Sequence, residues 1–314
     1  MGPVTQSAVA RQMSLPGRYV RNAVARWKAS GPKGLAEIAV VKLWPALSPV
    51  AYKSLRMRLH LGYWPNIRNP RTFNEKIAHR QLFAPNPLAS LVADKWRVRE
   101  YVAERGLAHI LNEVYFVTDA PETIPFDDLP DRFVTKANHG SGWNIIAKDK
   151  SKLDRQEVIR QCREWLSLKY GKATRSYESH YDSIQPVILV EKLLEDRDGR
   201  VPLDYKFFCF HGRAQYVVAI DRSASPTLNC YDREWQDMGF RMSYPIGKTV
   251  PKPALFDRMI EVAESLSVGF DFVRVDLYTP DSEIILFGEI TVNSGGGLAK
   301  FTPRKWDFRF GELW

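Results

Sequence analysis

Short strand-like segments dominate the second half of the sequence and limit the folds that it can adopt. Each is rich in β-branched, aromatic and aliphatic residues, and together they cover residues 132–136, 145–148, 187–190, 204–210, 214–220, 272–278 and 283–290. Helical periodicity fits residues 154–170 and 254–268. Because few helices lie between the strands, the pattern favours antiparallel sheets over one doubly wound sheet. The predicted fold class is therefore α+β.

The last two of these strands carry charged and polar residues among apolar ones. Arg274 and Asp276 share one face of the first strand, by the two-residue period of a strand. Glu289, Thr291 and Asn293 share one face of the second in the same way. Inward acids on adjacent strands repel each other unless cations lie between them. Their oxygen atoms suit Mg²⁺ bound to nucleotide phosphates, whereas two acids on separate solvent faces fit poorly with strands otherwise so apolar.

Lysines and glycines near strand ends indicate a second set of ligand-binding positions. Lys136 ends one strand and precedes a loop that contains Gly140, Ser141 and Gly142. Such a loop can offer backbone N–H groups to phosphate oxygens, although hairpin turns often contain glycines for other reasons. Lys206 lies inside an aromatic strand, where an unpaired ammonium group would be costly. It therefore needs an anionic partner, from the protein or from a ligand.

The apolar run of residues 187–190 leads into a segment that could hold a nucleotide base. That segment consists of Glu191, Lys192, Leu193, Leu194 and Glu195. An apolar slot with backbone groups at its edge would suit an adenine ring, and an acid would suit the ribose. The alternative is an ordinary strand end with solvated charges.

The positive charge of the chain is concentrated at its start. Residues 1–60 hold ten Lys or Arg against one acid, Glu37, whereas residues 61–314 are neutral overall. A basic segment suits nucleic acid or an anionic membrane surface. Trp27 and Trp44 among the cations favour the membrane surface and not nucleic acid. The alternative is a basic tail with a packing helix.

Other sequence features point to a cytoplasmic protein. No apolar run approaches the roughly 20 residues that a membrane-spanning helix needs. We see no secretory signal at the start of the chain. Cys162, Cys209 and Cys230 are widely spaced and odd in number, so we expect reduced thiols.

The order of these motifs resembles the ATP-grasp superfamily, and within it the TupA-like ATP-grasp proteins of bacterial surface-polysaccharide gene clusters. The resemblance covers roughly residues 50–314. It is carried by D-K-W-R-V-R-E-Y-V, F-V-T-K-A-N-H-G-S-G, H-Y-D-S-I-Q-P-V-I-L-V-E-K-L-L, D-Y-K-F-F-C-F-H-G, Y-D-R-E-W, F-V-R-V-D-L-Y and F-G-E-I-T. It implies two α+β subdomains that clasp a nucleotide, preceded by a mostly helical region. The expected divisions are residues 1–60 (basic, mostly helical), 61–125 (helical subdomain), 126–195 (lid subdomain) and 196–314 (C-terminal subdomain with the metal site).

The resemblance also implies roles for individual residues, with ATP and Mg²⁺ as cofactors. The cations expected at the ATP phosphates are Lys95, Lys136 and Lys206, under a mobile lid of Gly140, Ser141 and Gly142. The expected adenine hinge is Glu191, Lys192, Leu193 and Leu194, with Glu195 at the ribose. The expected Mg²⁺ ligands are Asp276 and Glu289, together with Thr291 or Asn293. The expected catalytic cations are Arg274 and Lys206.

One departure leaves part of the metal site open. Many ATP-grasp ligases have Asn two residues after the metal-binding Glu, followed by a Pro-Gly turn. This sequence has Thr291 at that place, Asn293 two residues later, and then Ser294-Gly295-Gly296-Gly297. Thr at this place also occurs in the TupA-like group, so it does not imply an inactive protein. Either Thr291 or Asn293 could complete the metal site.

The function implied by the resemblance is an ATP-dependent carboxylate–amine ligase that forms an acyl phosphate. Its expected substrates are a small or lipid-linked saccharide with a carboxylate, and an amine such as an amino acid. The basic start of the chain would contact the inner membrane leaflet from the cytoplasmic side. The alternatives are a kinase acting on a sugar hydroxyl, and a glycosyltransferase that uses Asp196-Arg197-Asp198 to bind metal. A degenerate nucleotide-binding scaffold is disfavoured because the expected cations and acids are all present.

Overall fold

The computed structural model describes residues 36, 39–40, 42–222 and 225–314. The chain divides into two compact units, Met1–Trp64 and Pro65–Trp314. In the first unit, helix α3 (Pro49–Leu61) begins after Ser48, whose hydroxyl accepts a hydrogen bond from the Ala51 N–H, and it ends at Gly62. Most of the predicted basic helical segment, including Trp27, lies outside the described residues. Among the described residues, no helix is long and apolar enough to cross a membrane.

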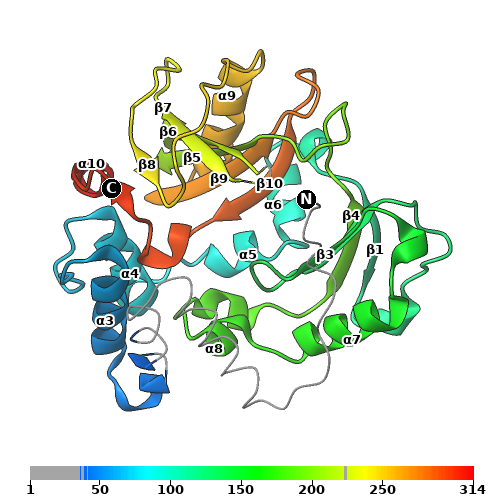
Figure 1. Cartoon of the computed structure of the whole chain (residues 1–314), viewed down its shortest axis with the longest axis horizontal. Coiled ribbons are helices and arrows are strands. Elements are labelled where there is room, and N and C mark those ends of the chain that lie inside the picture. Colours follow the sequence, from blue (N-terminus) through cyan, green and yellow to red (C-terminus); the bar gives the residue numbers. More distant parts are fainter. Residues whose placement is uncertain (1–35, 37–38, 41, 223–224) are drawn as a thin grey trace, which may run out of the picture. The chain divides into compact units, whose positions relative to one another are not determined.

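The second unit combines short helices with antiparallel strands (Figure 1). Its helices are α4 (Phe73–Phe83), α5 (Ala89–Ala93), α6 (Val98–Ala103), α7 (Arg155–Leu166), α8 (Tyr170–Thr174), α9 (Phe256–Ser267) and α10 (Lys305–Glu312). Its strands are β1 (Val114–Thr118), β2 (Phe133–Ala137), β3 (Asn144–Ala147), β4 (Ile188–Lys192), β5 (Asp204–Phe210), β6 (Arg213–Asp221), β7 (Thr227–Tyr231), β8 (Arg241–Met242), β9 (Phe272–Tyr278), β10 (Leu286–Thr291) and β11 (Phe301–Thr302).

The strands form two main sheets and one small one. The first sheet has the order β1-β4-β2-β3, and the second has the order β10-β9-β5-β6-β7. Strands β8 and β11 form the small sheet. Every neighbouring pair of strands in these sheets is antiparallel. The predicted α+β class with antiparallel sheets is thus confirmed.

Helix α7 packs on the first sheet. Its side chains Val158, Cys162 and Trp165 are buried and belong to one cluster with Phe133 and Val190 of the sheet. The first turn is capped by Asp154, whose carboxylate accepts a hydrogen bond from the Glu157 N–H at 3.1 Å. The sequence predicted one helix over residues 154–170, but the structure has two helices, α7 and α8, separated at residues 167–169.

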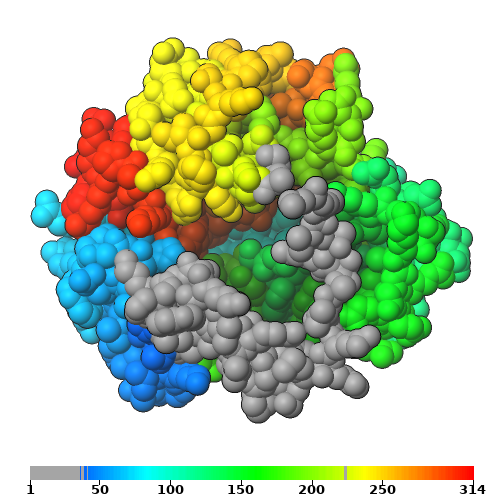
Figure 2. All heavy atoms as spheres, in the orientation of Figure 1, coloured from blue at the N-terminus to red at the C-terminus, as the bar shows by residue number. Residues whose placement is uncertain are grey.

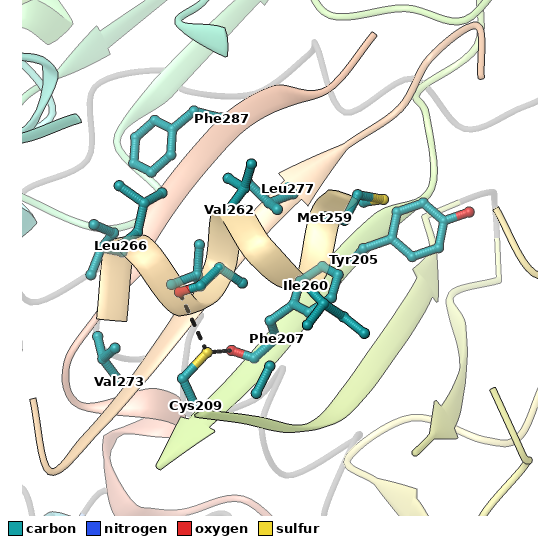
Figure 3. Close-up of a cluster of buried hydrophobic side chains, with 14 of the residues drawn as sticks. Tyr205, Phe207, Cys209, Met259, Ile260, Val262, Leu266, Val273, Leu277 and Phe287 are labelled. Atoms are coloured by element: carbon teal, nitrogen blue, oxygen red, sulfur yellow. Dashed lines mark hydrogen bonds between the residues drawn. The ribbon is translucent and has the colours of Figure 1, made fainter. Parts of the chain in front are cut away.

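Helix α9 covers one face of the second sheet (Figure 3). Met259 and Leu266 of the helix pack in one cluster with Phe207 and Val273 of the strands. The Cys209 thiol donates to the carbonyl oxygens of Phe207 and Ala263 at 3.7 and 3.8 Å. Burial raises the pKa of this thiol to about 12. All three cysteines are buried and free, as expected for reduced thiols.

The opposite face of the second sheet is divided into an aromatic part and a charged part. Helices α4 and α10 cover the aromatic part, where Phe73 and Phe310 pack against Phe208 with ring centroids 6.1 and 5.3 Å away. Lys206 lies two residues from Phe208 on β5, and therefore on the same face. The charged side chains around Lys206 thus begin where the aromatic cover ends.

Candidate functional site

A row of charged side chains crosses three strands of the second sheet. Lys206 of β5 is paired with Asp276 of β9, which is paired with Glu289 of β10. The pairing of Glu289 depends on a register shift between Phe287 and Glu289, at Gly288. A Cβ atom on Gly288 would lie 2.9 Å from the Asp276 carbonyl oxygen, so only glycine fits the shift as it stands.

Arg274 lies two residues before Asp276 on β9 and donates hydrogen bonds to both acids. Its Nε and Nη2 atoms donate to the two carboxylate oxygens of Asp276 at 2.6 and 2.7 Å. Nη2 also donates to Glu289 Oε1 at 2.7 Å. The Lys206 ammonium donates to Asp276 as well, and lies 2.9 Å from Asp204 Oδ2. The sequence predicted that cations lie between these acids. Arg274 and Lys206 are cations of the protein itself at this place.

These contacts shift the pKa values of the participating groups. Burial alone would lower the pKa of the Arg274 guanidinium, but the carboxylates of Asp276 and Glu289 outweigh it and raise the pKa. Burial would raise the pKa of Glu289, but Arg274, Lys206 and the Thr291 hydroxyl together lower it to about 2. Arg274 and Glu289 are thus ionised over the whole neutral range.

Thr291 and Asn293 occupy different positions relative to the acids. The Thr291 hydroxyl donates to Glu289 Oε1 at 2.7 Å and accepts from Arg274 Nη2 at 2.9 Å. Asn293 is 6% exposed, and its Oδ1 atom has no hydrogen-bond partner among the described residues. A buried amide oxygen without a donor is costly in the absence of a ligand. It is also an acceptor that a cation would satisfy.

The residues present fit a Mg²⁺ ion held together with phosphate oxygens. Mg²⁺ is usually bound by one or two carboxylates, with waters and substrate phosphates completing the octahedron. Asp276 and Glu289 are cross-strand neighbours that could supply the carboxylates, and Asn293 could supply an amide oxygen. Within the described part of the chain, no group of three or more His, Cys, Asp or Glu could form an all-protein metal cage.

Lys95, between α5 and α6, and Lys136 of the first sheet bring further positive charge. Lys136 of β2 lies 2.5 Å from the Glu191 carboxylate of β4. The Lys95 ammonium donates to the Gly140 carbonyl oxygen. Burial lowers the pKa of Lys95 to about 8, and the ammonium also interacts electrostatically with Glu289, Lys136 and Glu191. Lys95 therefore interacts electrostatically with charged groups of both sheets. Figure 2 shows a hollow between the green segment of the first sheet and the orange and red strands of the second.

The glycine loop forms the predicted turn between β2 and β3. A Cβ atom on Gly140 would lie 2.7 Å from a ring carbon of Trp143 and 2.8 Å from one of Tyr170, while Gly142 has a φ of 73°. His139 is buried, with Nε2 at 3.0 Å from the Trp165 carbonyl oxygen and Nδ1 at 3.0 Å from the Asn138 side chain. His139 thus stabilises the turn.

Four residues of the predicted adenine segment, all but Glu191, line a pocket of about 410 Å³. Its walls include Leu193 and Leu194 after β4, and Ile284 and Leu286 at the start of β10. Lys192 and Glu195 line it too. The Glu195 carboxylate accepts from Arg132, and the Lys192 ammonium lies 4.0 Å from Glu113 on the surface. The pocket thus combines apolar side chains with charged ones such as Asp196, Arg197 and Asp281.

One buried acid near the site was not foreseen. Asp204 is 1% exposed and accepts from Arg222 at 2.9 and 3.1 Å, which extends the charged groups to the residue that follows β6. Because Asp204 lies two residues before Lys206, the two-residue period could have found it. His180 Nδ1 lies 3.5 Å from Asn293 Nδ2. Burial raises the pKa of Tyr181, which interacts with Glu289.

The alternative metal motif of a glycosyltransferase lies in a polar surface turn. Asp196 Oδ1 accepts from the backbone N–H groups of Asp198 and Arg200, both at 2.9 Å. The Arg197 side chain lies 2.6 Å from Glu283. Asp196 thus stabilises the turn.

Similar solved structures are ligases of distant sequence. A D-alanine–D-alanine ligase from Bacillus anthracis in complex with ATP is 17% identical at a TM-score of 0.44, over 71% of this chain and 63% of the ligase. An L-amino acid ligase from Bacillus licheniformis is 12% identical at a TM-score of 0.41, over 84% of this chain and 56% of the ligase. The chain therefore spans less than two thirds of each of these proteins. No curated protein sequence matches it.

A family profile gives the assignment. The profile described as TupA-like ATPgrasp matches residues 75–314, which is most of the chain and includes both main sheets and every site residue described above. The protein belongs to the TupA-like ATP-grasp family.

Proposed function

We propose that the protein is an ATP-dependent carboxylate–amine ligase that acts through an acyl phosphate. The row of Lys206, Asp276 and Glu289, joined by Arg274, carries this proposal. It would offer two acids to Mg²⁺ beside two cations for a phosphoryl group. Lys136 of the first sheet and Lys95 between α5 and α6 would supply further cations. Membership of an ATP-grasp family supports the nucleotide as ATP.

The nucleotide would extend from the pocket beside Leu193 and Leu194 to the charged row. Leu193, Leu194 and Leu286 would enclose the adenine ring. Lys95, Lys136 and the N–H groups of the glycine loop would bind the phosphates. Asp276, Glu289 and Asn293 would hold Mg²⁺, which neutralises phosphate charge when bound. The present pairing of Lys136 with Glu191, and of Arg274 with Asp276, means that phosphate and metal would replace contacts that already exist.

The chemistry would need positioning and charge neutralisation more than covalent help from the protein. In the first step a carboxylate oxygen bonds to the γ-phosphorus and the bond to ADP breaks. In the second step an amine nitrogen bonds to the acyl carbon, phosphate leaves, and the nitrogen loses a proton. Arg274 and Lys206 would stabilise the charge spread over the transferred phosphoryl group.

The substrates of such a ligase would be a carboxylate and an amine. We infer a carboxylate-bearing saccharide, free or lipid-linked, and an amine such as an amino acid, in surface-polysaccharide synthesis. The excess of cations in residues 1–60 supports peripheral contact with an anionic membrane from the cytoplasmic side.

ADP binding in the presence of Mg²⁺ tests the proposal. We expect Mg²⁺ to tighten ADP binding to the native protein in isothermal titration calorimetry. Glu289→Gln should lose most of this tightening, because a carboxylate at the ion is replaced by an amide. Glu261→Gln is the control, since Glu261 is a surface residue of α9 paired with Arg258. Absence of ADP binding, or a Glu289→Gln protein equal to the native one, would contradict the proposal.

The reaction itself is tested by ADP release with uronic acids and amino acids. Release that requires both substrates, with an amide product, supports the ligase. Release without an amine, with a stable phosphorylated sugar, would show a kinase instead.

A further inference from the structure

Helix α4 carries two buried polar side chains that face the end of the charged site. Asn74 is fully buried and Arg80 is 3% exposed. The helix begins with a capping box in which the Thr72 hydroxyl accepts from the Glu75 N–H, and the Glu75 carboxylate accepts from the Thr72 N–H. A capped and buried helix of this kind is a rigid support for what its side chains bind.

Arg80 connects the two site strands where their own pairing ends. The last residue pair of the β9–β10 ladder is Arg274 with Thr291. Beyond it, Arg80 Nη1 donates to the carbonyl oxygens of Phe272 and Val292, both at 3.0 Å. One guanidinium nitrogen therefore holds the start of β9 to the residue that precedes Asn293.

The Arg80 guanidinium is itself fixed on its other side. Nη2 donates to Asp271 Oδ1 at 2.6 Å, and the Trp314 ring lies 4.1 Å from the guanidinium carbon. The Trp314 indole N–H donates to the second Asp271 oxygen at 2.7 Å. Burial lowers the pKa of Arg80 to about 10, with Asp271 opposing the shift, so the side chain is a cation at neutral pH. A planar guanidinium held in this way has one orientation.

Asn74 fixes the other end of the same loop. Its Nδ2 atom donates to the Ala299 carbonyl oxygen, and its Oδ1 atom accepts from the Ala299 N–H, both at 2.8 Å. The loop between Val292 and Ala299 contains Asn293 and Ser294, and the Ser294 hydroxyl accepts from Arg274 at 3.2 Å. Helix α4 therefore holds both ends of the loop that carries the unpaired Asn293 oxygen.

We propose that Arg80 and Asn74 are positioning residues that set the backbone of residues 292–299 for binding of the metal–phosphate group. Neither side chain contacts the acids, so both act through the loop. The proposal rests on the nucleotide and Mg²⁺ site proposed above. Residues that orient metal ligands typically change metal affinity by about 10- to 100-fold when replaced.

The test compares ADP affinity with and without Mg²⁺ in Arg80→Lys and Arg80→Gln. Lysine keeps the charge but lacks the planar fork. We expect about a 10-fold loss of ADP affinity in the presence of Mg²⁺, and unchanged affinity without Mg²⁺, because the adenine pocket and Lys136 are untouched. Arg105→Lys is the matched control: Arg105 also stacks on a ring, at 3.4 Å from Tyr101, and also donates to a backbone carbonyl.

Hydrogen exchange gives a readout that needs no ligand. Amides of residues 292–298 should exchange faster in Arg80→Lys than in the native protein, and not in Arg105→Lys. If Arg80→Gln does not fold, Arg80→Lys decides the matter. Native-like exchange in that loop together with native ADP affinity in Mg²⁺ would overturn the positioning role. A native protein that binds no ADP would instead overturn the proposed function, and the inference with it.

Discussion

Arg274 donates hydrogen bonds to four side chains, those of Asp276, Glu289, Thr291 and Ser294. A guanidinium can do this because its five N–H groups are spread over a fixed plane. Removing it would leave Asp276 and Glu289 without the cation that they share, so we expect the site to lose stability. At the scale of the residue, Arg274 therefore has a structural role in addition to the catalytic one we propose.

Lys95 should give ligand binding a pH dependence. Its pKa is lowered to about 8 by burial. Phosphate binds the protonated ammonium better, so ADP affinity should fall as the pH rises through 8. Lys95→Met should bind more weakly at pH 7 but without this fall, as measured by calorimetry from pH 7 to 9.5. An equal fall in both proteins would assign the effect to another group.

Lys95 should make the free energy of unfolding change with pH in the opposite direction to ADP affinity. The pKa in the folded protein lies below the ordinary value of 10.5. Between about pH 8 and 10.5 the unfolded chain therefore binds more protons than the folded one, and the free energy of unfolding rises with pH. In urea unfolding over this range, the free energy of unfolding should rise with pH more steeply in the native protein than in Lys95→Met.

At the scale of the element, the strands were predictable where buried apolar and aromatic residues follow one another. Strands β5 and β9 coincide with the predicted residues 204–210 and 272–278. Strands β1 and β7 were not predicted from the sequence. Strand β7 reads T-L-N-C-Y with Asn229 at its centre, a residue depleted in strands. It is placed by pairing with β6, which is a tertiary contact that periodicity does not contain.

Two glycines of the β2–β3 turn are required for different reasons, close packing at Gly140 and a positive φ at Gly142. Gly140→Ala should cost about 1–3 kcal/mol of unfolding free energy, because the new methyl group overlaps the packed rings of Trp143 and Tyr170. Gly142→Ala meets open space and should cost about 1 kcal/mol, from the positive φ alone. Gly199→Ala, with a φ of 72° in an open turn, is the control for the second effect. Urea unfolding measures all three, and equal losses would contradict the packing argument.

At the scale of the molecule, the candidate site draws on both main sheets of the second unit. The sequence could indicate which strands carry the acids and lysines, because the two-residue period assigns each side chain a face. It could not show that Asp276 faces Glu289, since this depends on the register shift at Gly288. Nor could it show the hydrogen bonds of Arg80, because their acceptors lie 191 to 212 residues away in sequence.

The division into two units predicts that residues 65–314 bind nucleotide alone. All the proposed site residues and the three hydrophobic clusters belong to that unit. A chain of residues 65–314 should therefore bind ADP and Mg²⁺ with the affinity of the full chain. It should lose binding to vesicles that contain anionic lipid, because the cationic excess lies in residues 1–60. Equal vesicle binding by both chains, in a sedimentation assay, would contradict the membrane role.

The three buried cysteines have a practical consequence. Cys162, Cys209 and Cys230 are all shielded, and burial raises the pKa of each to about 12 or above. Thiol-directed probes react with the thiolate, so the native side chains should remain unlabelled under mild conditions. A spin label or dye pair could then be attached to new surface cysteines, one on each sheet, without first removing the natural ones. Distances between the sheets could be followed in an otherwise unaltered protein as nucleotide is added.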